Sequence, residues 1–176
     1  MKIALSGAHS QGKTTLLNEL VKDRRMQGYA CVPSPTRILA AEGFSINESG
    51  NAKTQSMIMV QHFKNVTTFN LNALYDRCAL DGLAYSMFFE KDLRDNNLWD
   101  IAVSVFKYTI NQYDYIFYIE PELPLKDDGT RSVDYNFFNT VVNNFENIIK
   151  TYNLNVVRVK GTVQQRVDLI MKTINL

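Results

Sequence analysis

The stretch Gly7-Ala8-His9-Ser10-Gln11-Gly12-Lys13-Thr14 decides how this sequence is interpreted, because it fits the spacing G-x-x-x-x-G-K-[ST]. Glycines near both ends let the backbone curl so that successive N–H groups face one point, as a bound anion requires. Lys13 can then reach the outer phosphates of a nucleoside triphosphate, and the Thr14 hydroxyl can ligate Mg²⁺. The motif therefore predicts that residues 7–15, Gly7 to Thr15, bind the phosphates of a nucleoside triphosphate.

The flanks of this loop supply the strand and the helix that such a motif needs. Before it, Ile3-Ala4-Leu5 is an apolar run of the kind that forms a buried strand. After it, the segment from Thr15 to Val21 has apolar residues at positions 16, 17, 20 and 21, which is the spacing of one buried helical face. A phosphate is favoured at a helix N-terminus because unpaired N–H groups point outward there. The order strand, loop, helix therefore supports a phosphate-binding loop over a chance glycine-rich turn.

Beyond this unit, strand-like and helix-like segments alternate along the chain. Short runs of β-branched and aromatic residues predict strands at 29–32, 72–75, 113–119 and 155–159. Helical spacing predicts helices at 52–70, 135–152 and 163–174, and a long helical region that breaks near 95–97. Loops are expected at 43–51 and 125–134. The alternation predicts an α/β fold, in which a single domain spanning 1–176 has a five-stranded parallel sheet with helices on both faces.

Composition limits the partners and the location of the protein. A net charge of +1 offers no broad basic surface, so a nucleic-acid substrate is disfavoured but left open. No apolar run approaches the ~18 residues of a membrane span, and the first strand begins directly at the N-terminus, leaving no room for a signal peptide. We therefore expect a cytoplasmic protein with no membrane contact. Cys31 and Cys78 lie far apart in apolar stretches, and both are expected to be buried thiols.

Polar residues follow the expected strands at the positions where parallel sheets bind ligands. The phosphate-binding loop follows the first strand, Arg37 the second, Asp76 and Arg77 the third, and the segment 126–131 the fourth. These groups should converge on one edge of the sheet. Asp76 can ligate Mg²⁺ or accept a proton from an attacking hydroxyl, and Arg77 can neutralise phosphate oxygens or hold an anionic acceptor. A structural alternative makes Asp76 a helix N-cap and Arg77 a solvated charge.

The segment at the third strand exit carries a family resemblance. Residues 75–85, YDRCALDGLAY, resemble the D/E-R-x-x-x-D-x-x-A-Y block of small P-loop kinases, which include the ribosylnicotinamide kinase domain of bacterial NAD-biosynthesis regulators. The segment is also similar to the D-R segment of thymidylate kinases and deoxynucleoside kinases. With Pro35-Thr36-Arg37 and the stretch 121–131, PELPLKDDGTR, the similarity spans most of the chain and is most like the AAA_28-type family.

This resemblance implies a P-loop NTPase fold of the kinase type, with ATP and Mg²⁺ as cofactors and a small nucleoside or nucleotide as the acceptor. It implies that Thr14 and Asp76 hold Mg²⁺ and that Arg131 belongs to a lid, residues 125–134, that closes over the phosphates. The residues implied in catalysis are Lys13, Asp76, Arg77 and Arg131, and those implied in acceptor binding are Arg37, Arg77, Asp81 and Tyr85.

One position departs from the pattern of these kinases. Deoxynucleoside kinases place a glutamate as general base after the second strand, where this chain has Pro33-Ser34-Pro35. Either Asp76 takes the role of base, or the acceptor is a phosphate that needs little proton abstraction. In the second case Arg37 and Arg77 would hold the acceptor phosphate. Between Lys126 and Arg131, the two aspartates could cap a helix, bind metal or orient Arg131.

Histidine and aromatic residues admit a structural explanation as well as a functional one. His9 and His62 have no nearby carboxylate in a recognisable arrangement, so both are expected to be incidental to catalysis. Tyr85, Phe63 and Phe69 could stack on a base, but aromatic residues at helical spacing are more often core residues. We therefore expect Phe63 and Phe69 to share a core-facing side of their helix with Met59 and Val66.

The leading hypothesis is an ATP-dependent kinase that acts on a nucleoside, a nucleoside monophosphate or a related metabolite. The alternatives are a kinase acting on a hydroxyl carried by nucleic acid, and a regulatory ATP-binding or ATPase module. A GTPase-like switch is disfavoured because the sequence has no N/T-K-x-D tetrad, and a motor because no second strand ends in Asp-Glu. The motifs select neither the acceptor, nor ATP over another triphosphate, nor an oligomeric state.

Overall fold

The sheet of the protein is parallel and has five strands in the order β2-β3-β1-β4-β5. The computed structural model describes residues 1–69, 71–126 and 132–175. Connections between neighbouring parallel strands must cross over the sheet, which is why helices separate the strands along the chain. The strands are β1 (Lys2–Ser6), β2 (Ala30–Val32), β3 (Ala73–Asp76), β4 (Tyr115–Ile119) and β5 (Val157–Val159).

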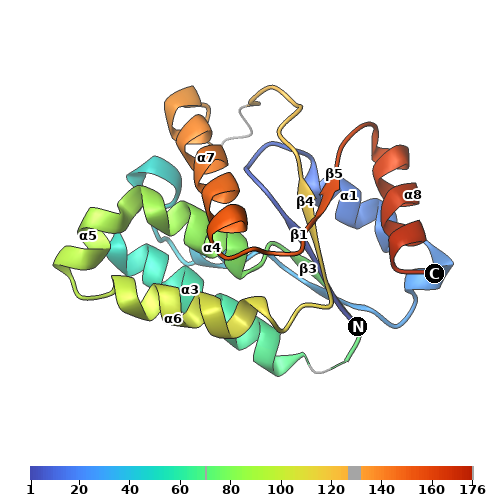
Figure 1. Cartoon of the computed structure of the whole chain (residues 1–176), viewed down its shortest axis with the longest axis horizontal. Helices are drawn as coiled ribbons and strands as arrows, with labels where there is room; N and C mark the ends of the chain where they lie inside the picture. The colour runs from blue at the N-terminus through green and yellow to red at the C-terminus, as the bar shows by residue number, and fades with distance from the viewer. Residues whose placement is uncertain (70, 127–131, 176) are drawn as a thin grey trace.

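Helices cover both faces of this sheet, as Figure 1 shows. One face carries α3 (Ala52–Thr68), α4 (Ala79–Ser86), α6 (Trp99–Ile110) and α7 (Tyr135–Thr151), and the other carries α1 (Lys13–Leu20) and α8 (Val163–Thr173). The shorter helices are α2 (Pro35–Ala41) and α5 (Glu90–Asp95), with single turns η1 (Arg24–Met26), η2 (Asn47–Ser49) and η3 (Met87–Phe89).

Alternation along the strands separates two buried clusters. Ala4 and Tyr75 pack under the four-helix face, whereas Ile3, Leu5 and Leu74 pack under α1 and α8. Successive side chains of a strand point to opposite faces, so a strand buried on both faces has a continuous apolar sequence. The α/β fold with a five-stranded parallel sheet, expected from the sequence, is confirmed.

The central strand β1 sets the position of the site. Leu5 pairs with Asp76 of β3, and Ser6 pairs with Tyr118 of β4, so these three strands end at almost the same level. The chain leaves β1 at Gly7 and leaves β3 at Arg77, which places the phosphate-binding loop beside the third strand exit. The expected convergence of these two exits is therefore confirmed.

Several local expectations were wrong. No helix was predicted directly after β2, but α2 begins at Pro35, because proline suits the first turn of a helix. Phe63 is 41% exposed, since the buried side of α3 is formed by residues such as Met59, His62 and Val66. Cys31 is exposed on β2 at the edge of the sheet, whereas Cys78 is buried as expected. Within the described residues, no helix is both long and apolar enough to cross a membrane.

Candidate functional site

The phosphate-binding loop leaves β1 through a glycine that no other residue could replace without strain. Gly7 has a φ of 137°, and a Cβ at this position would lie 2.6 Å from the carbonyl oxygen of Ile119 at the end of β4. The loop closes at Gly12, whose φ of 78° places it in the left-handed region before α1 begins at Lys13. The N-terminus of α1 therefore faces the loop with its unpaired N–H groups, which is favourable for an anion.

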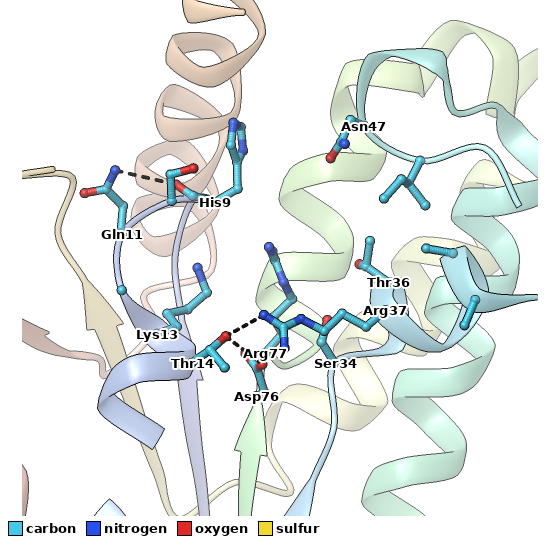
Figure 2. Close-up of a pocket in the computed structure, with 15 residues that line it drawn as sticks. His9, Gln11, Lys13, Thr14, Ser34, Thr36, Arg37, Asn47, Asp76 and Arg77 are labelled. Carbon is cyan, nitrogen blue, oxygen red and sulfur yellow. Dashed lines mark hydrogen bonds between the residues drawn. The ribbon is translucent and has the colours of Figure 1, made fainter. Parts of the chain in front are cut away.

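Lys13 and Thr14 stand at the start of α1, where the motif places them. The Lys13 ammonium donates to the carbonyl oxygens of Gly7 (2.7 Å) and Ala8 (2.5 Å) across the loop. The Thr14 hydroxyl donates to Asp76 Oδ2 at 3.3 Å and accepts from Arg37 Nη2 at 2.9 Å, as Figure 2 shows. Three segments far apart in the sequence thus meet at one hydroxyl group.

Thr14 and Asp76 fit a magnesium ion in the chemistry of their donors. Mg²⁺ prefers oxygen ligands and is commonly held by one or two protein oxygens together with water and substrate phosphates. Among the described residues, no group of three or more His, Cys, Asp or Glu side chains gathers in a way that could hold a metal. The Thr14 hydroxyl and the Asp76 carboxylate beside the phosphate-binding loop therefore fit an ion whose other ligands are water and phosphate oxygens.

Arg77 is held in a conformation that non-glycine residues rarely adopt. Its φ is 78°, its backbone N–H donates to the Leu5 carbonyl at 2.9 Å, and its side chain is 14% exposed. The guanidinium lies 3.3 Å from Asp81 Oδ1 and over the ring of Tyr85. Burial opposes the charge of Arg77, but Tyr85, Asp81 and Asp76 outweigh it and raise its pKa. Arg77 is therefore a fixed cation and not a solvated charge, and such backbone strain is typical of functional sites.

Asp81 connects the end of β1 to the segment that follows β3. Its Oδ2 accepts from the Ser6 hydroxyl (2.7 Å) and the Cys78 N–H (3.0 Å), and its Oδ1 accepts from the Gly7 N–H (3.2 Å) and Arg77. Cys78, not Asp76, is the N-cap of α4, and Asp81 completes its capping box. The N-cap alternative for Asp76 is thus wrong. The acceptor-binding role of Asp81 stays a prediction, and all these partners of its carboxylate are internal.

Because each Asp81 oxygen accepts internal hydrogen bonds, Asp81→Asn should destabilise the fold. An amide keeps one acceptor but turns an N–H₂ group toward donors, which leaves a buried donor unpaired and weakens the pair with Arg77. We expect a loss of about 2 kcal/mol in the free energy of unfolding, measured by urea titration. Asp23→Asn removes a surface pair with Arg25 and serves as the control, with little expected change. Equal losses in both variants would contradict the structural role of Asp81.

The residues of the three strand exits line one cavity of about 410 Å³. This volume lies within the range of small-molecule sites. Figure 2 shows Lys13, Arg37 and Arg77 gathered around Thr14 and Asp76 at its floor. The other wall was missed from the sequence and consists of residues from the N-cap of α2, from α2 itself and from the segment that follows it: Ser34, Thr36, Ala40, Ala41, Ile46 and Asn47. Pro35 at the start of α2 is the one feature of the sequence that could have indicated a helix at this wall.

A small hollow of about 20 Å³ extends the cavity toward α3. Thr36, Asn47 and Arg77 line both spaces, and Gln55 and Tyr85 line the hollow. Gln55 is 2% exposed, and its Oε1 has no hydrogen-bond partner in the described part of the protein. A buried amide oxygen without a donor is costly, so this atom suits a ligand that offers an N–H or O–H group. Gln55 could not be identified from the sequence, because its position looks like that of any polar residue in a helix.

Two histidines were expected to be incidental. His62 is buried against Gly82, and burial, with the nearby charge of Arg77, lowers its pKa to about 3, so it is neutral. His9 packs by its ring against Phe137 and Phe138, and its N–H donates to the Tyr85 hydroxyl at 2.9 Å. Tyr85 therefore supports the phosphate-binding loop, and its role in acceptor binding stays a prediction.

Part of the expected lid lies outside the described residues, including Arg131, Asp127 and Asp128. Lys126 is exposed and does not line the cavity. The assignments of Arg131 to catalysis and of 125–134 to a lid therefore stay predictions.

Comparison with known proteins adds a family and a set of structural neighbours. The AAA_28 family, described as an AAA domain, matches residues 2–166. No curated relative was found by sequence comparison. The NadR protein, solved in complex with NR, is 17% identical in sequence, with a TM-score of 0.76. The match covers 99% of this chain and 51% of the NadR chain. A second NadR structure, with NAD and AMP-PNP, is 15% identical, with a TM-score of 0.74, and the match covers 99% of this chain and 49% of that chain.

A deoxyadenosine kinase from M. mycoides, solved with dCMP and a flexible dCDP as products, is 19% identical with a TM-score of 0.65, over 99% of this chain and 98% of its own. The present chain spans about half the length of the NadR chains and nearly all of the deoxyadenosine kinase. At these identities the similarity establishes a shared fold. The family match covers most of the sequence, and the chain therefore belongs to the AAA_28 family and has the fold of P-loop kinases.

Proposed function

We propose that this protein transfers the γ-phosphoryl group of ATP, with Mg²⁺, to a nucleoside, a nucleoside monophosphate or a related small metabolite in the cytoplasm. The observation that carries the proposal is that one cavity is lined by Lys13, Thr14 and Asp76 and also by the two arginines Arg37 and Arg77. Phosphoryl transfer depends mainly on positioning two reactants and neutralising charge, and this cavity offers groups for both.

The donor side of the cavity would hold the triphosphate. Loop N–H groups and the N-terminus of α1 would bind its phosphates, and Lys13 would leave the carbonyls of Gly7 and Ala8 to reach the outer ones. Thr14 and Asp76 would hold Mg²⁺, which supplies charge neutralisation for the donor phosphates. AMP-PNP in one NadR structure supports an adenine nucleotide as the donor.

The acceptor side would be formed by α2, the segment around Asn47, and the hollow that contains Gln55. A nucleobase carries N–H groups and fits the unpartnered Oε1 of Gln55, while its sugar or phosphate would extend toward Arg37 and Arg77. The NR of one NadR structure and the dCMP of the deoxyadenosine kinase support an acceptor of this chemical kind.

In the proposed step, an acceptor oxygen forms a bond to the γ-phosphorus while the bond from that phosphorus to the leaving ADP oxygen breaks. If the acceptor is a hydroxyl, its proton passes to Asp76; if it is a phosphate, little proton abstraction is needed. Arg77, fixed by Asp81 and Tyr85, would hold the negative charge of the transferring group or of the acceptor.

The experiment is a panel of nucleosides and nucleoside monophosphates with Mg·ATP, followed by ADP release and by the mass of the acceptor. We expect at least one acceptor to gain the mass of one phosphoryl group in step with ADP. ADP release that no acceptor increases would favour an ATPase instead of a kinase.

The same panel separates the two acceptor classes through Arg37. For an acceptor that carries a phosphate, Arg37→Ala should raise KM about tenfold or more, because a charge-assisted contact is lost. For a neutral nucleoside, Arg37→Ala should change KM little, and Asp76 should matter more. Arg94→Ala, which removes an exposed arginine paired with Glu90, is the control. Small, equal effects of Arg37→Ala and Asp76→Asn on every acceptor would rule out both versions.

A further inference from the structure

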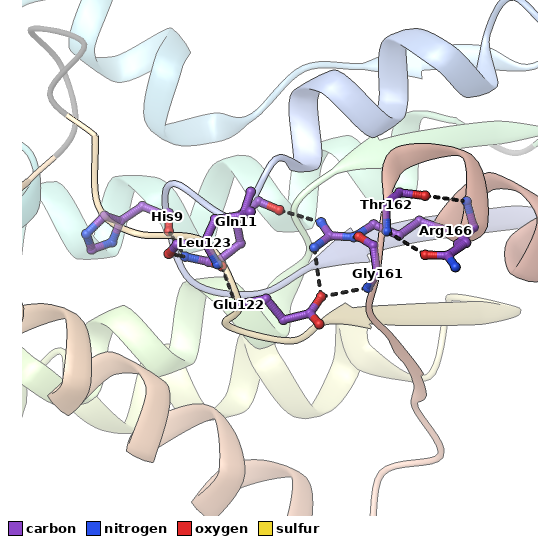
Figure 3. Close-up of polar contacts among 8 residues, drawn as sticks. His9, Gln11, Glu122, Leu123, Gly161, Thr162 and Arg166 are labelled. Atoms are coloured by element: carbon purple, nitrogen blue, oxygen red, sulfur yellow. Dashed lines mark hydrogen bonds and ion pairs between the residues drawn. The ribbon is translucent and has the colours of Figure 1, made fainter.

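A second polar cluster lies on the side of the phosphate-binding loop that faces the ends of β4 and β5. It consists of Gln11 in the loop, Glu122 and Leu123 after β4, Gly161 after β5, and Arg166 in α8, as Figure 3 shows. None of these residues except Gln11 lines the cavity, so their contacts serve something other than direct ligand binding.

Arg166 is the centre of this cluster. It is 3% exposed, and its guanidinium donates through Nη1 to the Gln11 carbonyl (2.7 Å), through Nε to the Gly161 carbonyl (2.8 Å) and through Nη2 to Glu122 Oε2 (3.1 Å). Glu122 also accepts from the Gly161 N–H at 2.7 Å, a bond that lowers the pKa of the carboxyl group together with Arg166. A planar guanidinium with several donors can satisfy this fork, whereas an ammonium cannot.

The Gln11 side chain extends the cluster into the segment after β4. Its Oε1 accepts from the N–H groups of both Glu122 and Leu123 at 2.8 Å, and its Nε2 donates to the Leu123 carbonyl at 2.9 Å. Gln11 is fully buried, so each of these bonds would be costly to leave unmade.

Gln11 lies between two loop residues that have a positive φ. Ser10 before it has a φ of 63° and Gly12 after it has a φ of 78°, both in the left-handed region. A non-glycine residue such as Ser10 pays roughly 1 kcal/mol or more for this conformation, and it persists only where the surroundings impose it. Two sets of contacts hold Gln11 between Ser10 and Gly12: Arg166 binds its backbone carbonyl, and the segment after β4 binds its side chain.

We propose that Arg166 is a positioning residue for the donor site: through Gln11, it holds the phosphate-binding loop in the curled form that receives the nucleotide. The part of this inference that concerns ATP rests on the proposed function, whereas the part that concerns loop conformation does not. A residue of the last helix, distant in sequence from the motif, thus sets the affinity for the donor.

The test compares Arg166→Met with the wild type, both without nucleotide, by amide hydrogen exchange at single residues. The N–H groups of Glu122 and Leu123 report on the Gln11 side chain, and we expect them to exchange about tenfold faster in the variant, because a charge-assisted bond is lost. The N–H groups of Gly7 and Cys78, which Asp81 holds on the other side of the loop, are internal controls and should not change.

Titration with a fluorescent ATP analogue and Mg²⁺ provides the second measurement. We expect Arg166→Met to bind it about tenfold more weakly and to raise KM for ATP while KM for the acceptor stays unchanged. Arg158→Met is the matched control, because Arg158 also pairs with glutamate, here Glu120 and Glu146, but does not touch the loop. It should leave both exchange and affinity unchanged.

A purely structural arginine would lower the thermal midpoint without these local effects. Unchanged exchange at Glu122 and Leu123, or an affinity within about twofold of the wild type in folded Arg166→Met, would overturn the proposal. If Arg166→Met does not fold, Arg166→Lys is measured in the same way, with smaller changes of the same sign expected. If the wild type binds no ATP, the proposed function fails, and the exchange comparison alone decides the role of Arg166.

Discussion

Lys13→Ala should lower kcat for phosphoryl transfer about a hundredfold or more, while the protein stays folded. The ammonium of Lys13 is the one loop cation that the motif directs toward the outer phosphates, where negative charge develops during transfer. In the structure it reaches across the loop to Gly7 and Ala8, so its stem already lies along the expected path of the phosphates. Initial rates with Mg·ATP and the best acceptor of the panel measure the effect.

The matched control for this variant is Lys22→Ala. Lys22 is exposed just after α1 and pairs with Glu19, so its removal changes the total charge equally without touching the loop. Circular dichroism should be the same for both variants and the wild type. If Lys13→Ala and Lys22→Ala turn over substrate at the same rate, the assignment of the phosphate-binding loop to the active site is wrong.

Asp76→Asn should lower kcat about a hundredfold and raise the Mg²⁺ concentration needed for half-maximal rate. Asparagine keeps an oxygen near the Thr14 hydroxyl but loses the charge that attracts the ion and the ability to take a proton. Titration with Mg²⁺ at fixed ATP separates these functions, because high Mg²⁺ restores metal binding and leaves any loss of base function in place.

Asp100→Asn provides the comparison for this variant, since Asp100 is exposed in the first turn of α6, away from the cavity. We expect its Mg²⁺ dependence to match that of the wild type. If Asp76→Asn has the same Mg²⁺ dependence and the same kcat as Asp100→Asn, Asp76 is neither a metal ligand nor a base.

The fold could be predicted because its signals are local. The phosphate-binding loop, one strand before it and one helix after it are all contained in the first two dozen residues, and each remaining strand is a short apolar run. Asp76 and Arg77 could be placed at the site for the same reason, since polar residues after parallel strands share one edge of the sheet.

The rest of the site depends on contacts between distant segments. Asn47, Gln55 and Arg166 have no motif around them. Their positions become informative only in the folded chain, where Asn47 and Gln55 line the hollow and Arg166 contacts the loop. Phe63 and Cys31 were assigned to the interior by pattern, but the packing of α3 against α4 and the edge position of β2 left both exposed. Periodicity identifies a helix more reliably than it identifies which residues of that helix are buried.

The most direct test of the central claim is the fate of the γ-phosphoryl group. With ATP labelled at the γ-phosphate, Mg²⁺ and the panel of nucleosides and nucleoside monophosphates, the label should appear in a phosphorylated acceptor in a one-to-one ratio with ADP. Lys13→Ala should abolish this transfer. Label that appears only as inorganic phosphate, at a rate no acceptor changes, would contradict the assignment of this protein as a kinase.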